Sequence, residues 1–524
     1  MNDEGRVRGP ARALLARYPL ARKALVAVPA LAAAGPFASI SPGASGFPYL
    51  YRVLWVLLAL VAIPLAFTKE VRTRLIPRLF TLLVVWWVIW TPITLQWSPT
   101  PRVGRTEILA SVASLLGAWV VLIVTKGSSR SLRYLRAGFV AAFVMTLLVV
   151  LWEFVTGEHL PAITGVQEWF FSLYLVSGTF TNPNGLSNFL LVCVAVLVAQ
   201  LAREVSVPHP RRALADAYEL DQPLTPADDG AATASAFPRH TSRGARWRVC
   251  GLVALLAFAV YILMLTGSRA GMMVSTLLFL LGAAWCLAAS PRRVVALALI
   301  GLAVAGPALS FTSLDRLRPP TALAKTQGEE PLSGHHVDTL TRQEMEADYA
   351  AADRMRLDLT KSGARSLADA PLIGNGAGSS MTKLEQDEEY GPGLDPKDRR
   401  IINLHNSFLE MGVNYGLIGL FPVILFIGGV LALVLHPGRL ARLWPDPNVL
   451  EALGVLLAVA VTSVIASSAV GDPTFWLFIA YAGAVAWNYA DADRVARPVS
   501  PSPNGGGPAH PLGPTEPAEP KAQL

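Results

Sequence analysis

Charged residues are scarce in this chain, since 15% of its 524 residues are Asp, Glu, Lys or Arg, whereas soluble domains carry about 25%. Cysteine is scarcer still: Cys193, Cys250 and Cys286 are the three in the sequence, and their spacing does not suit a metal site. The shortage of charge excludes a soluble enzyme and a disordered chain. The cysteine count excludes a secreted disulfide scaffold, and we predict neither a disulfide framework nor a zinc site.

Apolar residues are abundant instead. They make up 53% of the chain, give a mean hydropathy of +0.44, and collect in runs of about 18–22 residues, the length that crosses a bilayer as a helix. The 13 tryptophans suit such a protein, because indole rings favour the headgroup region. The net charge of +7 is interpreted as a sign of membrane topology and of attraction to anionic lipids, not of nucleic-acid binding. The predicted fold class is an all-α polytopic membrane protein.

The runs predict about 12 transmembrane helices. The first is the weakest, because Pro29 and Pro36 interrupt it. The basic residues before it resemble a signal peptide, but the apolar stretch is long and lacks a clean cleavage site, so we expect a retained helix. The expected spans are residues 24–40, 48–67, 79–97, 108–125, 137–156, 186–202, 249–266, 271–289, 293–312, 416–435, 449–470 and 473–490.

Basic residues between the spans predict the orientation. With the N-terminus in the cytoplasm, the cytoplasmic segments carry 28 Lys and Arg residues and the short outer segments carry 4. Long outer loops are not counted in the positive-inside rule. The sequence therefore predicts a multi-pass protein of the cytoplasmic (inner) membrane, with both termini in the cytoplasm.

This orientation divides the chain into seven segments. The exterior loop is expected to hold a helix, because Met345, Tyr349, Ala352, Met355 and Leu359 recur at helical spacing. The expected segments are a basic cytoplasmic N-terminus (1–23), membrane helices 1–6 (24–202), a flexible cytoplasmic loop (203–247), helices 7–9 (248–312), a large exterior loop with the catalytic motifs (313–415), helices 10–12 (416–490) and a disordered cytoplasmic tail (491–524).

Four short polar segments stand out, and all four fall on the exterior side. The first is SGTFTNPNG, residues 177–185, which contains Asn182 and Asn184. Asn-Pro and Asn-Gly favour turns, and a polar turn with a helix cap is the simpler interpretation. The second is TGSRAG, residues 266–271, with Ser268 and Arg269. Arg269 either snorkels to the headgroups or binds phosphate, for which its planar guanidinium is well suited.

The third segment begins with Arg356 and Arg365 and continues into PLIGNGAG, residues 371–378. Its glycines, Gly374 and Gly376 among them, form a tight turn or present N–H groups to an anion.

The fourth segment is LHNSFLEMGVNYG, residues 404–416. On a helix, Asn406, Glu410 and Asn414 would share one face. His405 is either a structural interfacial residue or a group for proton transfer near neutral pH.

Together, SGTFTNPNG, TGSRAG, Arg356 before PLIGNG, and HNSFLEMGVNYGLIGL resemble the O-antigen ligase and O-antigen polymerase superfamily of membrane glycosyltransferases. The resemblance covers residues 75–490 and implies a GT-C-like fold. It also implies a polyprenyl-pyrophosphate-linked glycan as donor, and a glycan or lipid-linked acceptor outside the cytoplasmic membrane. No metal and no cofactor are expected. Membrane lipids, a chain-length regulator and a flippase are the partner classes that fit.

The reaction assigns roles to these residues as a hypothesis. His405 is the base or acceptor positioner, and Arg269 and Arg356 clamp the pyrophosphate where many sugar transferases use magnesium. The expected substrate contacts are Asn182, Asn184, Ser268, Gly374, Gly376, Asn406 and Glu410.

A transporter or flippase of lipid-linked oligosaccharide is the alternative, and a structural membrane scaffold is a third class. A transporter predicts charged residues along a path through the helices. The predicted helix interiors are instead nearly free of charge, and Arg52, Glu153 and Asp472 lie near the ends of apolar runs. Ligase and polymerase share the motifs, so the sequence leaves these two open.

Overall fold

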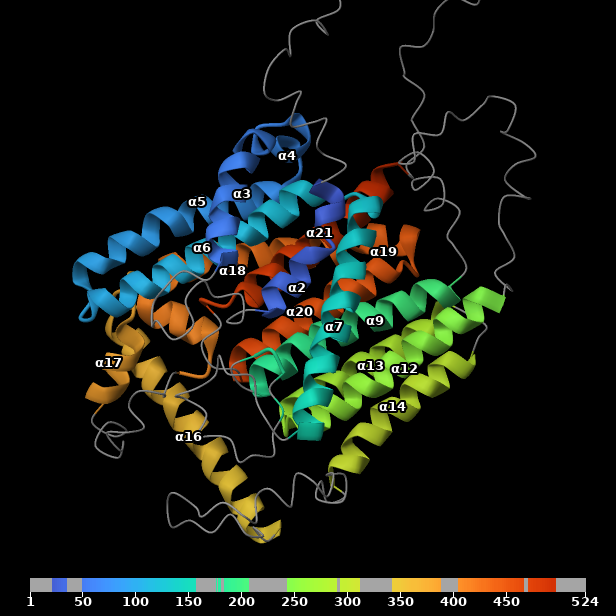
Figure 1. The fold of residues 1–524 in the computed structure, drawn as a ribbon. Helices are drawn as coiled ribbons and strands as arrows, with labels where there is room; N and C mark the ends of the chain where they lie inside the picture. Colours follow the sequence, from blue (N-terminus) through green and yellow to red (C-terminus); the bar gives the residue numbers. More distant parts are fainter. Residues whose placement is uncertain are drawn as a thin grey trace, which may run out of the picture.

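A computed structural model gives the fold as a bundle of long helices (Figure 1). It describes residues 21–34, 50–156, 176, 178–180, 183–206, 243–289, 293–311, 342–387, 404–465 and 470–495. Every element in these ranges is helical, as predicted. They are α2 (Ala27–Ala34), α3 (Leu50–Ala66), α4 (Lys69–Thr73), α5 (Leu75–Ile93), the 3-10 helix η3 (Thr94–Trp97), α6 (Pro101–Thr125), α7 (Ser129–Thr156), α9 (Pro183–Val205), α12 (Arg243–Leu265), α13 (Arg269–Ala289), α14 (Arg293–Phe311), α16 (Arg342–Asp369), α17 (Ser379–Gln386), α18 (Ser407–Val434), α19 (Pro437–Leu443), α20 (Pro447–Ile465) and α21 (Pro473–Val495).

Eight helices in the described ranges are long and apolar enough to cross a membrane. Two apolar helices, Arg52–Ala66 and Arg293–Ala308, are shorter. Each of the expected spans overlaps a described helix, although residues 35–40, 48–49, 312 and 466–469 of these spans lie outside the described ranges. The multi-pass character is therefore supported, and the larger span count stays a prediction. The eight candidates are Leu75–Trp97, Pro101–Thr125, Ser129–Thr156, Pro183–Val205, Gly244–Leu265, Arg269–Ala289, Ser407–Ala441 and Pro447–Val464.

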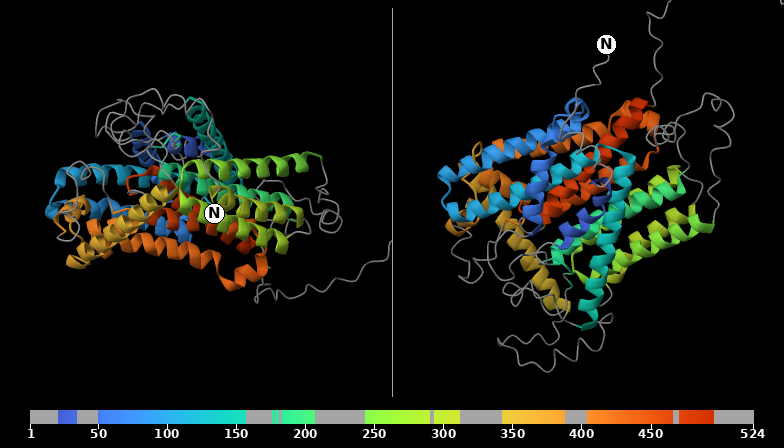
Figure 2. Two further views of the ribbon diagram at one scale, coloured as in Figure 1. Left: turned by 90° about the horizontal axis from the view of Figure 1, so that it is seen from below. Right: turned by 45° about the horizontal axis from the view of Figure 1, so that its top comes forward.

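Long helices that follow one another through a short turn, such as α12 and α13, run antiparallel, so the chain passes back and forth between the two ends of the bundle. At one end, Gly271 near the start of α13 packs against Ser187 near the start of α9. At the other end, Arg203 near the end of α9 binds Glu451 near the start of α20. Since α19 leads from the end of α18 to the start of α20, α18 begins at the first end. We call these the Arg269 end and the Glu451 end. Figure 2 gives two further views, in which α12, α13 and α14 again lie side by side.

Helix α18 breaks at Gly416, whose φ of 68° and ψ of −178° are not helical. A break inside a membrane helix leaves carbonyl groups that need new hydrogen-bond donors. Two tryptophans of α5 supply them: Trp90 Nε1 donates to Tyr415 O at 2.9 Å, and Trp86 Nε1 donates to Ile418 O at 3.0 Å. The break also falls where the sequence predicted the tenth span to begin.

The loop before α17 pairs with the broken stretch. Leu417 N donates to Pro371 O at 2.8 Å, and Ile418 N donates to Leu372 O at 3.1 Å. Only a glycine permits this approach, because a Cβ at Gly416 would lie 2.1 Å from Leu372 O. The break thus docks the loop at residues 371–378 onto a candidate membrane helix.

Gly416→Ala should destabilise the protein. Its φ and ψ lie in a region that is essentially restricted to glycine, which costs other residues about 1–3 kcal/mol, and the collision with Leu372 O adds to that. Gly428 of the same helix is a matched control, since a Cβ there meets nothing within 4 Å. Thermal unfolding in detergent should show a lower midpoint for Gly416→Ala and an unchanged or higher one for Gly428→Ala. Equal midpoints would contradict the packing described.

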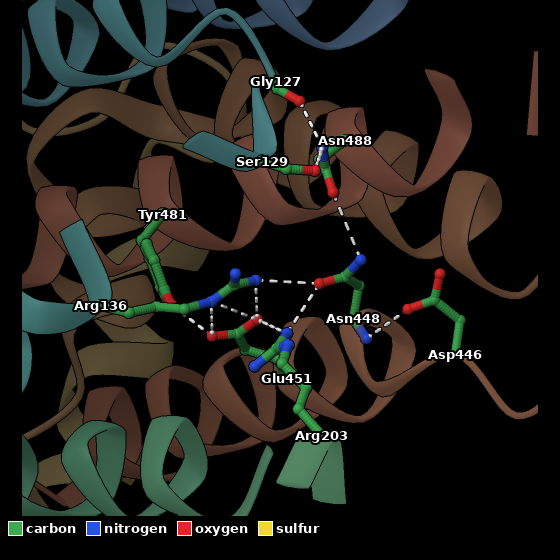
Figure 3. A network of polar contacts seen from close by, with 9 residues as sticks. All are labelled: Gly127, Ser129, Arg136, Arg203, Asp446, Asn448, Glu451, Tyr481 and Asn488. Atoms are coloured by element: carbon green, nitrogen blue, oxygen red, sulfur yellow. Dashed lines mark hydrogen bonds and ion pairs between the residues drawn. The ribbon is translucent and has the colours of Figure 1, made fainter. Parts of the chain in front are cut away.

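A buried polar network closes the Glu451 end (Figure 3). Arg136 Nε and Nη2 donate to the Glu451 carboxylate at 2.9 and 2.6 Å. Arg203 Nη2 and the Tyr481 hydroxyl donate to the same carboxylate. Asn448 Oδ1 accepts from both arginines, at 2.9 and 2.7 Å. The network therefore joins α7, α9, α20 and α21. It corrects the expectation that the helices are nearly free of charge, because Arg136 and Glu451 lie buried within them.

The network continues to the turn between α6 and α7. Asn448 Nδ2 donates to Asn488 Oδ1 at 3.3 Å, and Asn488 Nδ2 donates to Gly127 O at 2.6 Å and to Ser129 Oγ at 3.1 Å (Figure 3). Asn448 N donates to Asp446 Oδ1 at 2.8 Å. Two further segments are thereby fixed to the same four helices.

Glu451→Gln should cost about 3–5 kcal/mol of stability, the usual result of removing one partner of a buried ion pair. Two like charges, Arg136 and Arg203, would then face each other without a counter-charge. Glu204→Gln is the matched control, because Glu204 pairs with the exposed Arg248 and such pairs contribute about 0–1 kcal/mol. Denaturant unfolding in detergent measures both. If charge is the cause, adding Arg203→Gln to Glu451→Gln recovers part of the loss; a Glu451→Gln protein as stable as Glu204→Gln contradicts the account.

Candidate functional site

The turn between α12 and α13 holds Arg269 at the Arg269 end. Gly267 adopts a φ of 64° after α12 ends, a conformation that suits glycine at a helix C-terminus. Ser268 then caps α13, because its Oγ accepts from Gly271 N at 3.1 Å. Arg269 is the first residue of α13, and its side chain is exposed. The turn thus presents a guanidinium at the positive end of a long helix.

The SGTFTNPNG segment packs beside this turn. Gly178 N donates to the buried Glu153 carboxylate of α7 at 2.7 Å. Helix α9 starts at Pro183. Asn184 therefore lies within the first turn of the helix and is not its cap, although a helix cap was part of the polar-turn interpretation. Asn182 lies outside the described residues. Because Ser187 of α9 contacts Gly271 of α13, the first and second polar segments are neighbours, as their common side predicted.

The glycine-rich loop has its N–H groups engaged within the protein. Gly374 N donates to Ala370 O at 2.9 Å, and Gly376 N donates to Asn414 O at 3.1 Å. Both glycines have positive φ, and a Cβ at Gly374 would lie 2.4 Å from Gly416 N. Of the two interpretations that the sequence left open, the geometry favours the tight turn. The glycines allow close packing of the third polar segment on the fourth.

Residues 97–107 form a cradle for this loop. Trp97 Nε1 donates to Gly374 O at 3.0 Å, Ser98 Oγ donates to Ala377 O at 2.7 Å, and Thr100 Oγ1 donates to Gly378 O at 2.9 Å. A Cβ at Gly376 would lie 2.5 Å from Ser98 Cα. The cradle therefore positions the exterior loop from a segment almost 280 residues earlier in the chain.

Glu107 extends the cradle to α18. Its carboxylate accepts from the Tyr415 hydroxyl at 2.6 Å and from Asn414 Nδ2 at 3.0 Å. Asn414 Oδ1 accepts in turn from Ser379 Oγ at 3.1 Å and from Ser380 N at 2.9 Å. No pattern in the sequence points to Glu107, because its partners are more than 300 residues away.

The start of α18 carries the fourth segment. Asn406 caps the helix, since its Oδ1 accepts from Leu409 N at 3.0 Å. His405 therefore precedes the helix. Its φ of 46° is left-handed, which is uncommon for a residue other than glycine. Glu410 is buried in the first turn. Strained backbone conformations like that of His405 concentrate at functional sites.

Helix α16 lies across the start of α18 and fixes the position of His405. Gly363 of α16 packs against Leu404 and Leu409, because a Cβ there would lie 2.7 Å from each side chain. Arg356 lies seven residues earlier, which places it on the same face of α16 about two turns away. The helix predicted within residues 313–415 is confirmed by α16, and its exterior position stays a prediction. Met355 and Leu359 of its apolar stripe pack with Leu404; the first part of the stripe lies where side chains are not described.

Arg365 has a structural role on the same helix. Its Nη2 donates to Asp387 Oδ2 at 2.9 Å, and Ser362 Oγ donates to the same oxygen at 2.7 Å. These bonds join α16 to the residue that follows α17.

Asp472 lies at the Arg269 end, directly before α21. Its Oδ1 accepts from Thr474 N at 2.8 Å and from Thr474 Oγ1 at 2.7 Å. Burial raises the pKa of Asp472 above its ordinary value, an effect that the Thr474 bonds and the charge of Arg52 partly offset. This end therefore contains a carboxyl group that holds its proton to higher pH than an exposed aspartate.

The described residues contain no cluster of three His, Cys, Asp or Glu side chains that could hold a metal. The thiols of Cys193, Cys250 and Cys286 are all free.

These features define a multi-pass helical membrane protein whose polar sequence motifs, where the structure describes them, gather at the Arg269 end of the bundle. Residues 254–424 match the family model of the O-antigen ligases. The chain therefore carries an O-antigen ligase domain, in agreement with the resemblance that the motifs showed. The matched range contains Arg269, Arg356 and His405, whereas the 97–107 cradle lies outside it. No curated protein matches the chain.

Proposed function

We propose that this protein transfers a glycan from a polyprenyl-pyrophosphate carrier to an acceptor hydroxyl at the exterior face of the cytoplasmic membrane. The O-antigen ligase domain implies a lipid-linked glycan as substrate. The observation that carries the proposal is His405, which is held in a left-handed conformation between a buried leucine and a helix cap. The surrounding structure must stabilise a conformation of this kind.

His405 acts on the acceptor. The acceptor oxygen attacks the anomeric carbon of the donor sugar, the bond from that carbon to the pyrophosphate oxygen breaks, and the acceptor proton passes to His405. An imidazole suits this transfer near neutral pH. Asn406 and Glu410, next to it, contact the acceptor.

Arg269 and Arg356 bind the pyrophosphate leaving group. Guanidinium groups pair with phosphate oxygens through two parallel hydrogen bonds, and fixed positive charge stabilises the negative charge that develops on departure. The exposed position of Arg269 at a helix N-terminus and the common face of Arg356 and Gly363 support these roles. Asn182, Asn184 and Ser268 are proposed as further contacts. Gly374 and Gly376 serve through packing, and the reaction is proposed to need no metal and no cofactor.

The proposal includes the membrane topology that the sequence predicts. It has 12 spans of a GT-C-like fold, the segment boundaries given above, both termini in the cytoplasm, and the Arg269 end outside. Two observations weigh against the alternative, a transporter. Arg136, Arg203 and Glu451 join four helices at the proposed cytoplasmic end, and a transporter would have to break this buried ion pair in each cycle. The candidate residues also belong to one end, as a surface reaction requires.

Deletion of the gene tests the proposal and separates the two subclasses. We expect an altered surface polysaccharide. Single repeat units would indicate a lost polymerase, whereas full-length glycan left on the carrier lipid would indicate a lost ligase. Unchanged surface and lipid-linked glycans would contradict the proposal.

A further inference from the structure

The turn at residues 371–373 exposes apolar side chains where a loop outside the membrane would expose polar ones. Leu372 is 61% exposed and Ile373 is 45% exposed, and Pro371 before them is exposed as well. The glycine packing described above explains the loop after Gly374 but not these side chains.

The contacts of this turn place it at the depth of a membrane helix. Leu372 O accepts from Ile418 N, and Ile418 O accepts from Trp86 Nε1. Trp86 lies eleven residues before Trp97, the last residue of that candidate span. Trp97 Nε1 itself donates to Gly374 O at 3.0 Å, so residues 372–374 lie along the part of this candidate span between Trp86 and its end.

Three of the four carbonyl groups at residues 371–374 are paired within the protein, and Pro371 has no N–H group. The carbonyls of Pro371, Leu372 and Gly374 each accept a hydrogen bond. Carbonyls paired in this way can enter a bilayer, whereas unpaired ones cannot.

The apolar surface continues from the turn onto the two helices beneath it. Leu417 and Phe421 of α18 and Val85 and Ile89 of α5 are all exposed. Both helices belong to candidate membrane spans, so hydrocarbon covers these side chains.

We propose that Leu372 and Ile373 insert into the hydrocarbon of the outer leaflet and anchor the exterior loop to the membrane. Lipid acyl chains are the partner, because the exposed side chains are aliphatic and continue the lipid-facing surface of α5 and α18. The inference does not depend on the transfer reaction and goes beyond it. It explains why the loop that positions the candidate site docks onto the broken part of α18.

An environment-sensitive fluorescent label on single cysteines tests this in the full-length protein. Cys193, Cys250 and Cys286 are first replaced by alanine, and Leu372→Cys or Ile373→Cys is then labelled. Phe421→Cys, on the lipid-facing surface, is the membrane control, and Lys361→Cys, on the exposed face of α16, is the water control. The proteins are reconstituted in phosphatidylcholine–phosphatidylglycerol vesicles with and without doxyl-labelled lipid.

We expect the label at Leu372 to behave as at Phe421: emission shifted to shorter wavelength, loss of fluorescence with doxyl lipid, and no loss with aqueous iodide. A label that iodide quenches as at Lys361 would overturn the proposal, because the turn would then face water. A label that neither agent quenches would overturn it too, because protein would then cover the turn. Both side chains are exposed, so a cysteine at either position leaves the core packing unchanged, and Ile373→Cys gives a second, independent reading.

Discussion

Replacing His405 with alanine should lower the rate of glycan transfer about 100- to 10,000-fold, the contribution of a positioned general base. The acceptor hydroxyl then has no group to take its proton as it attacks the anomeric carbon. Purified protein with lipid-linked glycan and acceptor provides the assay, and the rate of acceptor glycosylation is the readout.

The left-handed backbone at His405 calls for a second variant, because alanine itself is strained there. Asparagine tolerates this conformation better than most residues, so His405→Asn keeps the backbone and removes the base. We expect it to be as inactive as His405→Ala. His436, exposed at the start of α19 and making no side-chain cap bond, is the matched control, and His436→Ala should retain full activity. An active His405→Asn protein would show that the backbone, not the imidazole, matters.

Replacing Arg269 with alanine should slow transfer about 100-fold or more, since preorganised groups of this kind contribute roughly 3–4 kcal/mol to stabilising the transition state. The pyrophosphate would then leave without the guanidinium that balances its charge. Arg269→Lys should recover part of the rate but not all, because an ammonium group lacks the planar fork that pairs with two oxygens.

Arg293 provides a control of matched position. It is the first residue of α14, as Arg269 is of α13, but it lies at the Glu451 end. Arg293→Ala should leave the transfer rate unchanged. Equal rates for Arg269→Ala and the wild type would remove the pyrophosphate clamp, whereas equal losses in both variants would point to a general effect of arginine on membrane insertion.

The helices themselves could be predicted from the sequence, because a bilayer demands long apolar runs and these are visible without any tertiary information. The tenth span is an example of a helix predicted in place but not in extent: it was expected at residues 416–435, whereas α18 begins at Ser407 and only breaks at Gly416. The polar segments could also be recognised from their turn-forming residues. The predicted topology placed all four of them on the same side of the membrane.

Contacts between distant segments could not be predicted in this way. In the sequence, Glu107 is one more charged residue at the start of an apolar run. Its structural role depends on hydrogen bonds from Asn414 and Tyr415, which only the fold brings next to it. Glu451 was hidden for the same reason, because its two arginines come from other helices. Competition between hydrogen-bond acceptors also decides whether the glycine-rich loop can bind an anion. Its N–H groups could donate to an anion, but in the fold they donate to nearby backbone carbonyls.

Reconstitution of the purified protein in liposomes tests the central claim most directly. The liposomes carry a polyprenyl-pyrophosphate-linked glycan labelled in its sugar, together with an acceptor. We predict that the label moves to the acceptor, that free polyprenyl pyrophosphate is released in equal amount, and that Arg269→Ala and His405→Asn abolish both. Label that crosses the bilayer with its pyrophosphate linkage intact, and never reaches the acceptor, would contradict the account.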